Sequence, residues 1–144
     1  MKTFLITSII FLCFSSYAQD FSWKKNCENE KSNTEIGECM LKSCNDATTY
    51  FENLYDEIYK KIKSDLTKTG SEGVEKEILT IYINYLPILK KSLSDMALAS
   101  AEIDSSSYID GSGYAIFKYE SLLKYIEQNI ETLKKIQSEM INFQ

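Results

Sequence analysis

The sequence predicts a small all-α protein, an antiparallel bundle of three to four helices with an N-terminal disulfide. Three runs of apolar residues recur at steps of three and four, which is the spacing of one face of a helix. The 144 residues include one proline and five glycines, so few interruptions of the helices are expected. A chain of this length forms one domain rather than two.

The first 18 residues are predicted to be a secretory signal. Lys2 supplies a basic start, the stretch from Phe4 to Phe14 is mostly apolar, and Ser16 and Ala18 are small residues before a cut at Gln19. The apolar stretch is too short to span a bilayer, which needs about 20 residues. The domain therefore comprises residues 19–144 and is predicted to be periplasmic or secreted. Losing one lysine and no carboxylate changes the net charge from −5 to −6.

Three cysteines, Cys27, Cys39 and Cys44, remain after this cut. In an oxidising compartment two of them are expected to pair and one is left over. Three sulfurs without histidine make a poor zinc site, and the chain has no C-x-x-C redox motif. The sequence therefore predicts one structural disulfide that joins the N-terminal lead-in to the first helix. Whether Cys39 or Cys44 pairs with Cys27 stays open at this point.

The first helix is predicted to begin near Ser32, which has capping-box spacing to Glu35, with Thr34 as an alternative cap. Asn45-Asp46 could interrupt it, so one long helix and a short helix followed by a long one are both allowed. The segment from Thr67 to Gly73 is interpreted as a turn. The predicted apolar face comprises Ile36, Met40, Cys44, Ala47, Phe51, Leu54, Ile58, Ile62 and Leu66.

The second helix is predicted to start near Val74. Pro87 lacks a backbone N–H, so a kink or a break is expected there. The segment around Ile81 to Tyr85 is strongly apolar and is interpreted as the most buried stretch of the chain. The predicted apolar face comprises Val74, Ile78, Tyr82, Tyr85, Leu89, Leu93 and Met96.

The stretch from Asp104 to Gly113 is rich in serine and glycine and is predicted to be a loop. Its aspartates suggest calcium, but no register places both a glycine at position six and a glutamate at position twelve of an EF-type loop. The loop is therefore interpreted as a connector. It leads to a third helix, whose predicted apolar face comprises Ile116, Tyr119, Leu123, Ile126, Ile130, Leu133, Ile136 and Met140.

The composition argues against an enzyme. The chain has no histidine, so the usual general base and metal ligand are missing, and all of its 16 positive charges are lysines. We predict no catalytic residues, no metal and no cofactor. The negative net charge also argues against nucleic-acid binding. The numerous carboxylates, which could in principle form an acid–base pair, are interpreted as solvated helix faces: Glu28, Glu30, Glu35, Glu38 and Asp46.

Part of the chain resembles the N-terminal domain of the lysozyme inhibitor LprI-like family, formerly a domain of unknown function. Cys27, Thr34-Glu35 and Cys39 keep the order Cys-x6-Thr-Glu-x3-Cys, and Tyr55 follows on the next helix, sixteen residues beyond Cys39. The resemblance favours pairing of Cys27 with Cys39, a short loop whose closure corresponds to about 3 kcal/mol in the chain-entropy model. The chain departs from the family's later motifs at Thr48, Phe51-Glu52, Leu93, Ala97 and Ala101.

The resemblance implies a helical, disulfide-bonded envelope or secreted protein, some of whose relatives inhibit lysozyme. The predicted function is binding to a protein partner, with a basic lysozyme as the sharpest case and steric occlusion as the mechanism. Asp104 and Asp110 are the candidate partner-binding residues, because they lie in the predicted loop and carry the right charge. The alternative is a structural or assembly-related cell-envelope protein without lysozyme activity.

Overall fold

The computed structural model describes residues 26–68, 73–106 and 112–141, with the backbone alone at 101–106 and 112–115. A short 3₁₀ turn, η1 (Cys27–Asn29), precedes three long helices, α2 (Asn33–Thr67), α3 (Val74–Ser106) and α4 (Ser112–Ile141), and these ranges contain no strand. The predicted all-α bundle is confirmed. The predicted signal, residues 1–18, lies outside the described residues.

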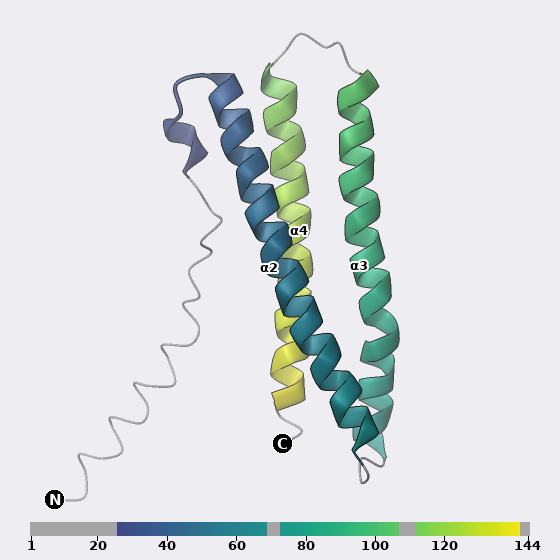
Figure 1. Ribbon diagram of the computed structural model, residues 1–144. Helices are drawn as coiled ribbons and strands as arrows, with labels where there is room; N and C mark the ends of the chain where they lie inside the picture. Colours follow the sequence, from purple (N-terminus) through teal and green to yellow (C-terminus); the bar gives the residue numbers. More distant parts are fainter. Residues whose placement is uncertain (1–25, 69–72, 107–111, 142–144) are drawn as a thin grey trace, which may run out of the picture.

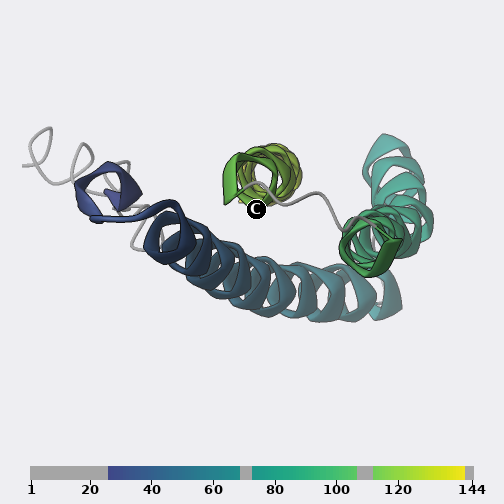
Figure 2. The same cartoon turned by 90° about the horizontal axis from the view of Figure 1, so that it is seen from above.

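The three long helices run in alternating directions, so that α2 and α4 are parallel and α3 is antiparallel to both (Figure 1). Seen from above, α2 is strongly tilted and slants past α4, from the lead-in toward α3 (Figure 2). The pairing of α2 with α4 is the most extensive in the fold. Two bonds mark its parallel register: the Cys44 thiol donates to the Tyr119 carbonyl oxygen at 3.3 Å, and the Gln137 amide donates to Glu57 at 3.1 Å.

The helix α2 begins where its capping sequence predicts. Ser32 is the N-cap, and its hydroxyl accepts a hydrogen bond from the Glu35 backbone N–H at 3.2 Å. The Glu35 carboxylate in turn accepts from the Lys31 backbone N–H at 3.0 Å, one residue earlier than in an ideal capping box. The helix then continues through Asn45-Asp46 without a break, so the single long helix is the correct alternative.

The core lies along the faces that α2 and α4 turn toward each other and toward α3. The predicted spacing of apolar residues is confirmed for α2 and α4. On α4, Leu122 is more deeply buried than the predicted Leu123. Among the described helices, none combines the length and the apolarity that crossing a bilayer requires. The side chains with at most 2 % exposure in this core are Cys44, Ala47, Phe51, Ile58, Ile62, Leu79, Leu86, Ile126, Ile130, Leu133 and Met140.

The sequence predicts a kink or a break of α3 at Pro87. The helix continues through this residue, which excludes the break. Pro87 is exposed, so the Ile83 carbonyl that loses its intrahelical N–H partner lies on or near the solvent side of the helix. Packing of α3 on both sides of the proline outweighs the cost of one missing hydrogen bond.

The buried face of α3 agrees with the prediction at Leu89 and Leu93, which are in the core, but differs from it in part. Leu79 and Leu86 are in the core, whereas the predicted core residues Val74 and Tyr85 are exposed. Ile81 is 63 % exposed, so the segment from Ile81 to Tyr85 is not the most buried stretch of the chain. This stretch carries apolar residues on several sides of the helix, and only one of those sides faces α2 and α4.

The connector between α3 and α4 is shorter than the loop predicted from the sequence. The helix α3 extends through Asp104 to Ser106, and α4 already starts at Ser112 rather than at Ile116. Residues 104–106 and 112–113 are therefore helical and not part of a loop. At the other end of the bundle, α2 stops at Thr67 and α3 starts after Gly73, whose positive φ of 81° suits a glycine.

The N-terminal lead-in is held against α2 by its cysteines. The Sγ atoms of Cys27 and Cys39 are 2.06 Å apart, at bonding distance, which is the pairing that the family resemblance favours. Cys27 is buried, and among the described elements η1 packs only against α2. The disulfide thus fixes one end of the bundle without taking part in its main core.

Candidate functional site

The chain has no histidine, so a metal site would have to be built from cysteine and carboxylate side chains. No cluster of three or more of these side chains within residues 26–68, 73–106 and 112–141 is arranged to hold a metal ion. The candidate sites are the surfaces described below.

Cys44 is the free cysteine, and it lies in the core at 2 % exposure. Burial, reinforced by the nearby carboxylate of Glu127, raises the pKa of its thiol to about 11. A thiol that keeps its proton at neutral pH and that solvent cannot reach is a poor nucleophile. Cys44 therefore serves packing rather than chemistry.

We expect alkaline pH to destabilise the fold through Cys44. In the unfolded chain the thiol ionises near its ordinary pKa of 9.0, whereas in the folded chain it stays protonated to about 11. The unfolded state therefore binds fewer protons in this range, and the free energy of unfolding falls as the pH rises from about 9 to about 11. Tyr82, with its pKa raised to about 12 by its hydrogen bond to Glu139, acts in the same direction at higher pH.

Urea unfolding at a series of pH values measures this effect, and a Cys44→Ala variant is the control. The variant should lose less stability between pH 9 and 11 than the parent chain. A thiol titration complements it: one reactive thiol per chain is expected in denaturant and none in the native state at neutral pH. Equal alkaline slopes for parent and variant would contradict the assignment.

The first candidate surface is the solvent face of α2 together with the disulfide-bonded lead-in, which we call the acidic face. Residues 26–57 contain eight carboxylates and two lysines, a net charge of −6 that equals the charge of the entire predicted mature chain. All eight carboxylates are exposed. The acidic face comprises Glu28, Glu30, Glu35, Glu38, Asp46, Glu52, Asp56 and Glu57.

These carboxylates are exposed to solvent, as predicted, with Glu28 and Glu30 in the lead-in and the others along α2. Asp56 and Glu57 are adjacent on the outside of α2, and Glu57 accepts the hydrogen bond from Gln137 on α4. The remaining residues of the predicted mature chain sum to zero net charge. The net negative charge of this protein is therefore concentrated on the lead-in and the part of α2 up to Glu57, where it attracts positively charged molecules.

The predicted binding residues are only partly placed by the structure. Asp104 belongs to α3, although its side chain is not described, and Asp110 lies outside the described residues. The end of α3 that carries Asp104 lies at the end of the bundle where α2 begins (Figure 1). Asp104 is thus at the same end as the disulfide, but on a helix rather than in the predicted loop.

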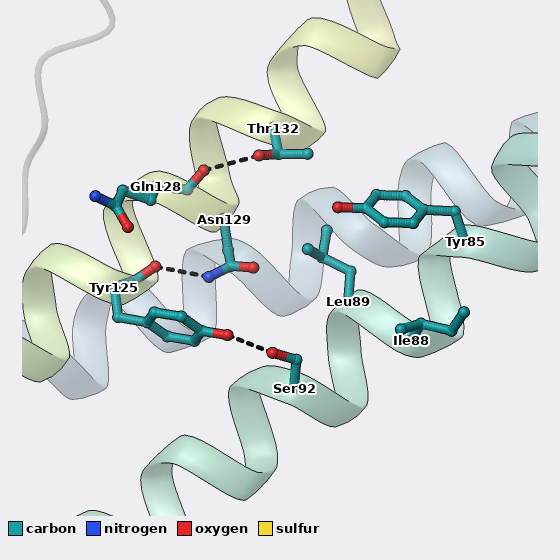
Figure 3. Close-up of a pocket in the computed structure, with 8 residues that line it drawn as sticks. All are labelled: Tyr85, Ile88, Leu89, Ser92, Tyr125, Gln128, Asn129 and Thr132. Atoms are coloured by element: carbon teal, nitrogen blue, oxygen red, sulfur yellow. Dashed lines mark hydrogen bonds between the residues drawn. The ribbon is translucent and has the colours of Figure 1, made fainter.

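The second candidate surface is a groove between α3 and α4, with a volume of about 280 Å³. Tyr85, Leu89 and Ser92 line it from α3, and Tyr125 and Asn129 line it from α4 (Figure 3). The remaining lining residues are Ile88, Gln128 and Thr132. None of the eight is charged, so the groove offers nothing to fix an ionic ligand, and its volume lies below that of ordinary small-molecule sites, about 300–1,000 Å³.

The polar groups of the groove are bonded mainly among themselves. The Ser92 and Tyr125 hydroxyls form a hydrogen bond across it, and the Asn129 amide donates to the Tyr125 carbonyl oxygen at 2.7 Å (Figure 3). The Thr132 hydroxyl donates to the Gln128 carbonyl oxygen at 3.0 Å. These internal bonds occupy part of the polar groups, and the surface of the groove is about equally polar and apolar, a mixture that suits side chains of another protein.

A smaller opening of about 260 Å³ lies between α2 and α3, and residues of α4 also line it. Core side chains such as Phe51 and Leu122 form its floor, and Glu52 and Lys90 lie at its rim. The Lys90 ammonium is 4.8 Å from the centre of the Tyr55 ring, a cation–π contact. Residues of α2, α3 and α4 line this opening, so it belongs to the packing among the three helices.

Comparison with family models, curated proteins and solved structures finds no match. The resemblance to the lysozyme inhibitor LprI-like family therefore stays a prediction from the residues Cys27 to Tyr55. The sequence pattern indicated exposed carboxylates but not their concentration on α2. The groove leaves no signal in the sequence, because residues 85–92 and 125–132 come together only through the packing of α3 on α4.

Proposed function

We propose that this chain is an exported, non-enzymatic protein that binds a basic protein partner, in the sharpest case a lysozyme that it inhibits by covering the active-site cleft. The acidic face is the observation that carries the proposal. Eight exposed carboxylates against two lysines within residues 26–57 create a local negative field on an otherwise neutral chain. Lysozymes of the chicken type are basic, so this field would steer the two proteins together.

The disulfide supports the proposal because it makes the acidic face rigid. Because the Cys27–Cys39 bond fixes the lead-in to α2, Glu28 and Glu30 are held on the same body as Glu35 and Glu38. A charged surface that is ordered before binding loses less conformational entropy in the complex than a flexible one. An oxidised, exported protein retains this arrangement, whereas a reduced one would release part of it.

A lysozyme turnover assay on bacterial cell walls, with the purified chain from Gln19, tests the proposal. We expect the rate to fall at micromolar protein, and the inhibition to weaken as salt rises from about 50 mM to about 300 mM, because exposed charges are screened over these distances. No slowing with chicken-type or other lysozymes at micromolar concentrations would overturn lysozyme inhibition.

Charge reversals locate the surface. Glu38→Lys with Asp56→Lys changes the acidic face, and Glu120→Lys with Asp95→Lys changes the net charge equally on α4 and α3, with all four side chains exposed. We expect at least about a tenfold loss of inhibition for the first pair and less than about twofold for the second. Equal losses for the two pairs would show that net charge alone acts and would remove the acidic face as the binding surface.

A further inference from the structure

The helix α3 carries a row of exposed apolar side chains beside its buried face. Val74, Ile81 and Ile88 follow one another at intervals of seven residues and are 71 %, 63 % and 65 % exposed. Tyr85, at 40 % exposure, lies next to the last two. We call these four residues the α3 stripe. Single exposed apolar residues are ordinary, but a contiguous row at heptad spacing is the seam that one helix presents to another.

The middle of the α3 stripe, from Ile81 to Ile88, is uncharged, whereas Lys76 and Glu77 lie beside Ile81 on the side toward Val74. From Ile78 to Leu89 the sequence contains no charged residue, and the groove that begins at Tyr85 and Ile88 continues onto α4 without one. The acidic face lies on α2, a different helix. Two copies of this acidic chain would therefore approach each other with least repulsion along this part of α3.

The charges that flank the stripe indicate how two copies would be oriented. Glu77, Asn84 and Lys91 form the heptad row beside Val74, Ile81 and Ile88, the place where e and g residues flank a coiled-coil seam. Glu77 and Lys91 lie seven residues on either side of Asn84 and have opposite charges, and both residues are exposed. When two such helices pair antiparallel about Asn84, each Glu77 meets the other copy's lysine.

We propose that the α3 stripe is the interface of a symmetric dimer in which α3 pairs antiparallel with α3 of a second copy, with Asn84 near the two-fold axis. Ile81 of one copy then lies opposite Ile88 of the other, and the same contact recurs on the other side of the axis, as an isologous interface requires. In this register Val74 lies opposite Ser94 and Asp95 of the other copy, so Ile81, Tyr85 and Ile88 form the apolar centre of the interface. Tyr85 lies close to the axis, and the α3–α4 groove beside it receives side chains of the second copy. This dimer is independent of the acidic face and of the proposed partner.

Equilibrium sedimentation over a concentration series tests the dimer. The parent chain should pass from monomer to dimer and no further, because a two-fold interface closes on itself. Ile81→Glu should raise the dissociation constant at least about tenfold by placing a charge in the seam. Ile141→Glu is the matched control: Ile141 is 62 % exposed but on α4, outside both the stripe and the groove, and its change should leave the dimer unchanged.

A charge exchange tests the antiparallel register. Glu77→Lys alone and Lys91→Glu alone should each weaken the dimer, because each puts like charges opposite one another. The double variant Glu77→Lys with Lys91→Glu should recover most of the affinity, which a merely structural role of these residues would not produce. Helical content by circular dichroism should stay the same in all three variants, since Glu77 and Lys91 are exposed.

Several results would overturn the proposal. If the chain remains monomeric at high concentration, the stripe is not a dimer interface and is available to another protein. If assemblies larger than a dimer form, the contact is open and non-symmetric. Failure of the double variant to recover affinity contradicts the antiparallel register. None of these outcomes bears on lysozyme inhibition, which the cell-wall assay measures separately.

Discussion

Replacing Phe51 with alanine should lower the free energy of unfolding by about 3–5 kcal/mol, the range for large-to-small changes at fully buried aromatic residues. Phe51 has 0 % exposure and lies in the middle of α2, within the core shared with α3 and α4. It also contacts Tyr55, with the ring centres 6.2 Å apart. The change therefore removes an apolar side chain and leaves a cavity that long, regular helices close only in part.

Phe117→Ala is the matched control for this prediction. Phe117 is on α4 and 67 % exposed, so its truncation removes little buried surface, and alanine has the higher helix propensity. We expect its effect to stay within about 0.5 kcal/mol. Urea unfolding followed by circular dichroism measures both variants. Similar losses for Phe51→Ala and Phe117→Ala would mean that the core does not lie where the structure places it.

The sequence was sufficient to predict α2 and α4, and the reason is physical. In both helices a single apolar face alternates with charged residues, so that only one rotation about the helix axis buries the apolar side chains. Phe51, Ile58 and Ile62 on α2, and Ile130 and Leu133 on α4, are all buried as their spacing predicts. The cap at Ser32 likewise follows from a local hydrogen bond that needs no tertiary contact.

The orientation of α3 could not be predicted in the same way. Because residues 78–89 are uncharged and apolar on several sides, the period identifies a helix without fixing which side faces the core. Packing against α2 and α4 selects Leu79 and Leu86, and Ile81 and Ile88 are left outside. The mistaken assignment of Val74 and Tyr85 to the core thus has the same origin as the α3 stripe: this helix has two apolar faces and the monomer covers one.

The two candidate surfaces also differ in how far the sequence predicts them. The acidic face is largely encoded locally, since its carboxylates follow one another along one stretch of chain and need only a helix to become a surface. The groove is encoded non-locally, because Tyr85 on α3 and Tyr125 on α4 are neighbours only after the helices pack (Figure 3). Spacing rules that compare residues within one helix give no information on such a pair.

Removing the disulfide with Cys27→Ser and Cys39→Ser should lower the free energy of unfolding by up to about 3 kcal/mol, the value that the chain-entropy model gives for a loop of this length. The 12-residue separation sets that upper value. Because η1 packs only against α2 among the described elements, the reduced lead-in can also leave α2 while the bundle stays folded. The lead-in then regains conformational freedom in the folded state, which reduces the net loss of stability. The main effect of the change should therefore be local.

Hydrogen exchange distinguishes the local from the global effect. In the double variant, amides near Glu30 and in the first turns of α2 should exchange faster, whereas amides around Phe51 and Ile130 should change only by the global loss of stability. Cys44→Ser is the control, since Cys44 is a free thiol and its change leaves the lead-in attached. If the variant instead loosens the whole bundle far beyond the entropic value, the lead-in contributes to the main core. Inhibition by the variant, compared with the parent, then shows whether Glu28 and Glu30 act only when held against α2.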